Sequence, residues 1–203
     1  VALLAVSALL ASCSESELWQ NPQTEARDGY IMLNFKTEIP AMQEVVTRAV
    51  DPDGGGVQDM TLFCFDSYGL FISTVKAGVT VQKPGPGEME GTFKAEVPEN
   101  TRTIHFLANQ NMDEFKEDSF RNKSESEVMA VLEGSSGRMI YWGRFACDAG
   151  NDSNIAEQMA TSGNSVKLIR NHARISVDNP DNNGHIVITG FAVCNTNAFG
   201  TVA

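Results

Sequence analysis

The residues in this chain with the widest chemistry are four cysteines and three histidines. The cysteines form no Cys-x-x-Cys pair and have no spacing with histidine that is typical of a metal site. Each histidine lies in a strand-like run with no metal ligand two or four residues after it, so we expect structural roles for His105, His172 and His185. A calcium loop starting at Asp51 fails, because its twelfth position is Leu62 and not a bidentate glutamate.

Motifs for other kinds of catalysis are also missing from the sequence. There is no Gly-x-Ser-x-Gly nucleophile motif, and the glycine-rich segments lack the Lys-Ser/Thr step of a phosphate loop. Paired carboxylates leave no sequence signature, so an enzyme is kept as the third hypothesis. We predict no catalytic residues, no metal ion and no cofactor.

Cys13 is the cysteine whose neighbours define a chemical role. Residues 1–10 are almost wholly apolar and carry no charge, which is typical of a secretory signal. This segment is too short for a membrane span of about 20 apolar residues. Ala11 and Ser12 precede Cys13 and a polar segment follows it, as in a bacterial lipobox, where the cysteine thiol receives diacylglycerol. We therefore expect lipidation of Cys13 and export as a lipoprotein. The alternative is a buried helix that ends in cysteine.

The other three cysteines carry weaker information. One disulfide among Cys64, Cys147 and Cys194 would suit an oxidising compartment but would leave one thiol over. Cys64 and Cys194 lie in apolar runs, where a cysteine often behaves as a small buried hydrophobe, and this interpretation is favoured. The sequence does not decide their disulfide state.

Composition narrows the class of protein. The hydrophobic fraction of 42% can support a core, and the length suits one sizeable domain after the signal. The net charge of -11 and the scattered basic residues argue against binding to nucleic acid. We divide the chain into a signal peptide (1–13), a tether (14–28) and one domain (29–203), and expect the start of the signal and a C-terminal domain to lie outside it.

The clearest predicted element is a strand at 29–39. Its apolar residues alternate with polar ones, which indicates one buried face made of Ile31, Leu33, Phe35 and Ile39. The segment 41–56 follows and closes in a cluster of turn-forming residues, so we expect an exposed loop.

Further strands and one helix complete the expected fold. A hairpin is predicted from 57–66 and 70–77, and the run 62–65 is apolar on both faces, which indicates a central strand. A capping box at Ser124 and Glu127 predicts a helix that ends at Gly134, and a weaker helical turn is expected at 113–120. The remaining predicted strands are 89–97, 103–109, 138–146, 165–177 (with a bulge between Leu168 and Ile169) and 185–194. This pattern predicts a mainly β fold, an antiparallel β-sandwich with one or two short helices.

The order of these motifs resembles the FimA/Mfa-like fimbrillins of Bacteroidales, the subunits of type V pili. The resemblance covers most of the chain. Its residues are the lipobox at Cys13, the strand at 29–39, Thr47-Arg48-Ala49, Leu62-Phe63-Cys64-Phe65-Asp66, Phe106-Leu107-Ala108-Asn109, Met139-Ile140-Tyr141-Trp142-Gly143, Val166-Lys167-Leu168 with Arg170, and Gly190-Phe191-Ala192-Val193-Cys194-Asn195.

The resemblance implies a fold, a location and an assembly route. The domain would be a transthyretin-like β-sandwich, carried to the cell outer membrane by lipid on Cys13 and exposed at the surface in a fimbrium. An Arg-specific protease would cut between Arg48 and Ala49 and release the strand at 29–39. Other fimbrial subunits would then donate a strand to the vacated groove. Without the resemblance, Arg48 would be a solvated loop charge.

The leading hypothesis is therefore a structural subunit of an adhesive cell-surface fimbria. Alternatives are a surface lipoprotein that binds glycans through a β-sandwich, and a fimbrial anchor or tip subunit that does not polymerise. Glycan binding favours exposed aromatic rings, and the two tryptophans of the chain lie in the tether (Trp19) and in a predicted strand (Trp142).

Overall fold

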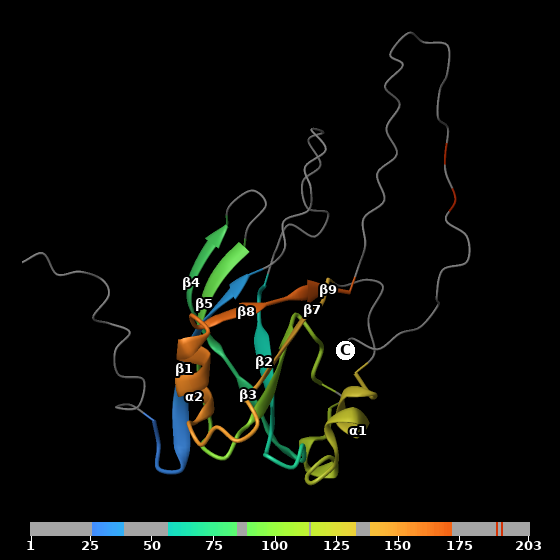
Figure 1. The fold of residues 1–203 in the computed structure, drawn as a ribbon. Coiled ribbons are helices and arrows are strands. Elements are labelled where there is room, and N and C mark those ends of the chain that lie inside the picture. Colours follow the sequence, from blue (N-terminus) through green and yellow to red (C-terminus); the bar gives the residue numbers. More distant parts are fainter. Residues whose placement is uncertain are drawn as a thin grey trace, which may run out of the picture.

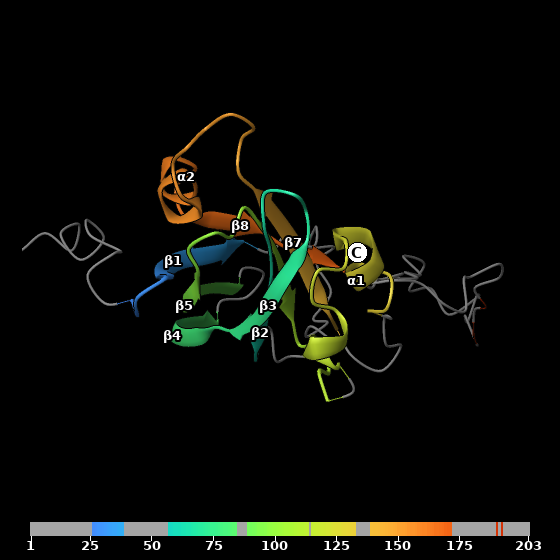
Figure 2. The ribbon, with the colours of Figure 1, turned by 90° about the horizontal axis from the view of Figure 1, so that it is seen from below.

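The computed structural model describes residues 26–38, 57–84, 89–113, 115–132, 139–171, 190 and 192. Most of these residues form two β-sheets that face each other (Figures 1 and 2). Sheet A has the strand order β4 (Gly78–Pro84), β5 (Met89–Pro98), β1 (Tyr30–Glu38) and β8 (Ser165–Lys167). Sheet B has the order β3 (Phe71–Lys76), β2 (Met60–Phe65), β6 (Thr103–Ala108), β7 (Tyr141–Ala146) and β9 (Ile169–Arg170). The predicted mainly β sandwich is confirmed, although β1 and β8 pair in parallel and not antiparallel.

The core of the sandwich lies between the two sheets. Alternate residues of β1 and β5 meet alternate residues of β2 and β6, as period-2 strands with one buried face require. β2 is buried along its whole length, which confirms the prediction of a central strand. Its second face supports a smaller apolar cluster outside sheet B. That outer cluster consists of Phe63, Phe65, Phe71, Leu107, Val128, Met129 and Leu132.

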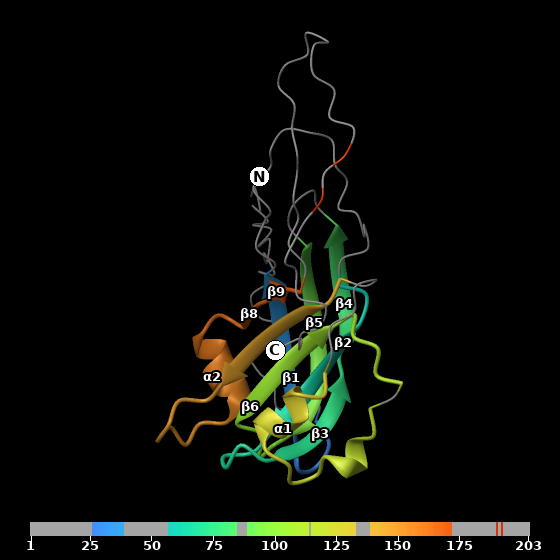
Figure 3. The ribbon, with the colours of Figure 1, turned by 90° about the vertical axis from the view of Figure 1, so that its right-hand side faces the viewer.

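Helical segments cover the outside of sheet B. The helix α1 (Glu125–Met129) lies over the outer cluster, in front of sheet B in Figure 3. Phe115 and Phe120, on either side of the 3-10 turn η2 (Glu117–Ser119), pack against the same cluster. The predicted capping box is present, since the Ser124 side chain accepts from the Glu127 backbone N–H and the Glu127 carboxylate accepts from Ser124 N–H. The helix ends at Met129, earlier than the predicted end at Gly134, which lies outside the described residues.

Two elements were not predicted from the sequence. The helix α2 (Ile155–Thr161) starts with a second capping box, made by Asn154 and Glu157, and adds Ile155 and Met159 to the core. The strand β4 follows β3 with one residue, Ala77, between them.

The chain passes from one sheet to the other at two single residues. Ala77 joins β3 of sheet B to β4 of sheet A, and Leu168 joins β8 of sheet A to β9 of sheet B. The predicted bulge between Leu168 and Ile169 is therefore wrong, because the shift in apolar parity marks a change of sheet. Both sides of the sandwich are thus bridged by continuous chain, as strands that turn a corner between packed sheets do.

Candidate functional site

The strand β1 is the feature on which the functional hypothesis depends. It lies inside sheet A, paired antiparallel with β5 over Tyr30 to Thr37 and in parallel with β8 over Lys36 to Glu38. It is therefore not an edge strand, and its removal would separate β5 from β8 and leave unpaired backbone groups on both.

The inward face of β1 fills the middle of the core. Ile31, Leu33 and Phe35 are buried there, with Phe35 fully shielded from solvent. The Phe35 ring stacks on Phe93 at 5.6 Å between centroids and meets the edge of Phe106 at 5.0 Å. Through Phe35, β1 thus makes aromatic contacts both within sheet A and with sheet B. Such contacts stabilise a fold by more than the burial of their apolar area alone.

The burial on β1 is a large part of the stability of a domain of this size. Full burial of a large apolar side chain contributes about 1.5–3 kcal/mol, so these three contribute roughly 5–9 kcal/mol before the entropy of ordering the strand is deducted. A whole domain is stable by only about 5–15 kcal/mol. A sandwich without β1 would therefore be barely stable.

The inward face also carries one polar residue, Thr37. It is fully buried, and its Oγ1 has no hydrogen-bond partner among the described residues. Next to it, Lys36 N–H donates to Asn164 O and Glu38 O accepts from Leu168 N–H, at 2.7 and 2.8 Å. The C-terminal end of β1 is therefore held by backbone bonds to the β8 segment.

The N-terminal end of β1 is held by side chains. The Arg27 guanidinium donates to the Glu96 carboxylate of β5 at 2.7 Å and lies 4.3 Å from the centre of the Tyr30 ring. Hydrogen bonds from the Arg27 backbone N–H and guanidinium lower the pKa of the Glu96 carboxyl. Because the Arg27–Glu96 ion pair is at the surface, we expect it to add little to the stability of the domain. Its role would be to orient the chain that leads into β1.

The structure does not describe the other predicted site residues. Cys13, Arg48, Ala49 and Ile39 lie outside the described residues, so the lipidation and cleavage assignments stay predictions. Neither helix in the described part of the chain is long and apolar enough to cross a membrane.

The described part of the chain contains two cysteines, Cys64 and Cys147. Cys64 and Cys147 are free thiols, and burial raises the pKa of the Cys64 thiol to about 12. A thiol that stays protonated is a poor nucleophile and metal ligand. Within the described ranges, no group of three or more His, Cys, Asp or Glu side chains could hold a metal ion.

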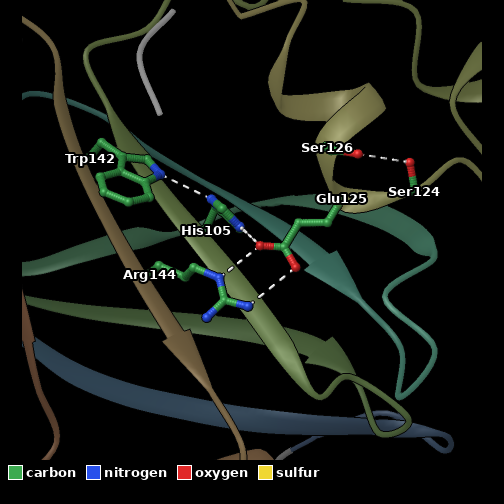
Figure 4. Close-up of polar contacts among 6 residues, drawn as sticks. All are labelled: His105, Ser124, Glu125, Ser126, Trp142 and Arg144. Atoms are coloured by element: carbon green, nitrogen blue, oxygen red, sulfur yellow. Dashed lines mark hydrogen bonds and ion pairs between the residues drawn. The ribbon is translucent and has the colours of Figure 1, made fainter.

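One polar cluster was missed by sequence reasoning, because its members come from distant parts of the chain (Figure 4). His105 Nε2 lies 2.7 Å from Glu125 Oε1, and His105 Nδ1 accepts from Trp142 Nε1–H at 2.9 Å. Arg144 donates to both Glu125 oxygens, at 2.7 and 3.2 Å, and this lowers the pKa of the Glu125 carboxyl. Both His105 nitrogens therefore have side-chain partners, one on α1 and one on β7.

No family model, curated sequence or solved structure matches this chain. The resemblance to the fimbrillins therefore stays a hypothesis.

Proposed function

We propose that this chain is a structural subunit of a cell-surface fimbria, similar to the FimA/Mfa-like fimbrillins, which assembles by losing β1 and accepting a strand from another subunit. The observation that carries the proposal is the place of β1, a core strand in the interior of sheet A that precedes the segment 41–56. A core strand that precedes all the other described strands is separated from them by a single cut in the segment that follows it.

The vacated groove would favour a replacement strand for physical reasons. Loss of Ile31, Leu33 and Phe35 exposes apolar surface of β5, β2 and β6, and the facing backbone groups of β5 and β8 lose their partners. Exposed apolar surface and unpaired strand edges both promote addition of an extended segment from another chain. The neighbouring subunit would supply that segment.

The remaining residues have roles in the same route. Lipid on Cys13 would carry the subunit to the cell outer membrane, and an Arg-specific protease would cut between Arg48 and Ala49. Arg27 precedes β1 in the chain, so it would leave with this strand after the cut, and its contact with Glu96 of β5 would be lost. A subunit that kept β1 after the cut would instead serve as an anchor.

The proposal is tested by treating the purified full-length protein with an Arg-specific protease. We expect fibres or a ladder of oligomers, detected by electron microscopy and size-exclusion chromatography. Arg48→Lys is the matched control, because it keeps the charge and removes the cleavage site, and it should stay monomeric. A wild-type protein that is cut after Arg48, releases the β1 fragment and forms no assembly would contradict the proposal.

A further inference from the structure

The hydrogen bonds around His105 fix which of its nitrogens carries the proton. The indole Nε1–H of Trp142 can only donate, so His105 Nδ1 must accept and carries no hydrogen. The single proton of the neutral ring is then on Nε2, which donates to the Glu125 carboxylate. Because the ring is only 3% exposed, water does not compete for these positions.

A second proton on His105 is incompatible with this arrangement. It would be added at Nδ1 and would place an N–H against the N–H of Trp142, so the Trp142 bond would be lost. The Glu125 contact would survive, because a carboxylate attracts the imidazolium. The change is therefore directed at Trp142 and not at α1.

The surroundings of His105 oppose its protonation at physiological pH. Burial in an apolar site lowers the pKa of His105, the Glu125 carboxylate of α1 raises it, and the Arg144 guanidinium of β7 lowers it further. β2 contributes the uncharged Phe65 ring, whose centroid lies 5.6 Å from that of His105. Among the described residues, Glu125 and Arg144 are the charged groups that act on this ring.

Trp142 connects the histidine to the outside of sheet B. Its ring packs against the outer cluster, and its register partner on β9 is Ile169, which is 57% exposed. A rotation of the indole away from His105 would change the apolar surface beside β9.

We propose that His105 and Trp142 form a proton-operated switch on the outer face of sheet B: neutral His105 holds the indole N–H of Trp142, and protonated His105 releases it. The switch is independent of strand exchange at β1. The surface beside β9 would then differ between neutral and acidic surroundings. Protonation of histidines changes protein surfaces in the same way in other pH sensors.

The test follows the Trp142 indole by NMR in a Trp19→Phe variant of the full-length protein, so that one indole signal remains. As the pH falls below the ordinary histidine pKa of about 6.5 and through the lowered pKa of His105, we expect the Trp142 Nε1–H resonance to move with the same midpoint as the His105 imidazole nitrogens. Exchange of the indole proton with water, corrected for its intrinsic pH dependence, should rise at least about tenfold across that midpoint. An indole signal that stays constant while His105 titrates would overturn the proposal.

Three variants separate this switch from other titrations. His105→Gln keeps an acceptor for Trp142 and a donor for Glu125 without a charge, so its indole signal should not titrate. His172→Gln with His185→Gln should retain the wild-type midpoint. Trp142→Phe removes the competing donor and should raise the pKa of His105, and an unchanged His105 pKa in this variant would also overturn the proposal.

Discussion

Close approach of two strands constrains single residues in this protein. Gly143 of β7 is such a position, because a Cβ placed there would lie 2.8 Å from the backbone oxygen of Lys167 and 2.9 Å from a methyl group of Leu168. The backbone oxygen belongs to the segment that passes from sheet A to sheet B, and it cannot turn away as a side chain can. Position 143 therefore requires a glycine because there is no room for a Cβ atom, and not because of its backbone conformation.

Replacing Gly143 with alanine should therefore destabilise the fold. We expect Gly143→Ala to lower the free energy of unfolding by about 1–3 kcal/mol, because β7 or the β8 segment must move outward. Chemical denaturation gives the value. Gly78→Ala is the matched control, since its Cβ would meet only Lys94 O at 3.8 Å. Equal losses in both variants would show that crowding at the crossing is not the cause.

At the scale of elements, β1 is the strand whose two faces differ most clearly. Phe35 is fully buried between the sheets, and its neighbour Lys36 is exposed. Phe35→Ala should cost about 3–5 kcal/mol of stability, as deletion of a buried ring does. Lys36→Ala, one residue away on the other face, should change stability by no more than about 0.5 kcal/mol. The denaturant midpoints of the two variants test this prediction. If Phe35→Ala lost no more stability than Lys36→Ala, the assignment of β1 to the core would be wrong.

Elements were predictable from the sequence where local pattern determines them. The period-2 alternation of β1, the doubly apolar β2 and the capping box at Ser124 all lie within a few residues, and all three appear in the structure. The helix α2 could have been found from the same signal, because Asn154 and Glu157 repeat the capping pattern.

What the sequence could not predict depends on contacts between distant residues. The change of sheet at Leu168 was interpreted as a bulge, because parity within one strand does not show which strand it pairs with. The hydrogen bonds of His105 are a second case, because its partners Glu125 and Trp142 lie 20 and 37 residues away along the chain. Neither partner has a spacing that a sequence pattern would select.

At the scale of the whole molecule, the sandwich is bridged on both sides by chain that changes sheet, while its N-terminal strand occupies the interior of sheet A. The crossings at Ala77 and Leu168 limit opening at the sides. β1 is the first of the described strands, so a single cut in the segment that follows it would separate it from all the others. We therefore expect exchange to be confined to the groove between β5 and β8.

The most direct test is a disulfide lock between β1 and β5. Asn34 and Lys94 are register partners in an antiparallel pair, where Cα atoms lie about 4.5–5.5 Å apart, within the range that a disulfide can bridge. Protein with Asn34→Cys and Lys94→Cys would be cleaved after Arg48 and offered a fluorescent peptide of residues 29–39, with binding read by fluorescence polarisation. The single variants and a Phe35→Asp peptide are the controls.

We expect that the oxidised, locked protein binds no peptide, that reduction restores binding, and that the Phe35→Asp peptide does not bind in either state. Equal binding before and after reduction, or no binding by cleaved wild-type protein that has lost its own strand, would contradict the claim that β1 is an exchangeable core strand.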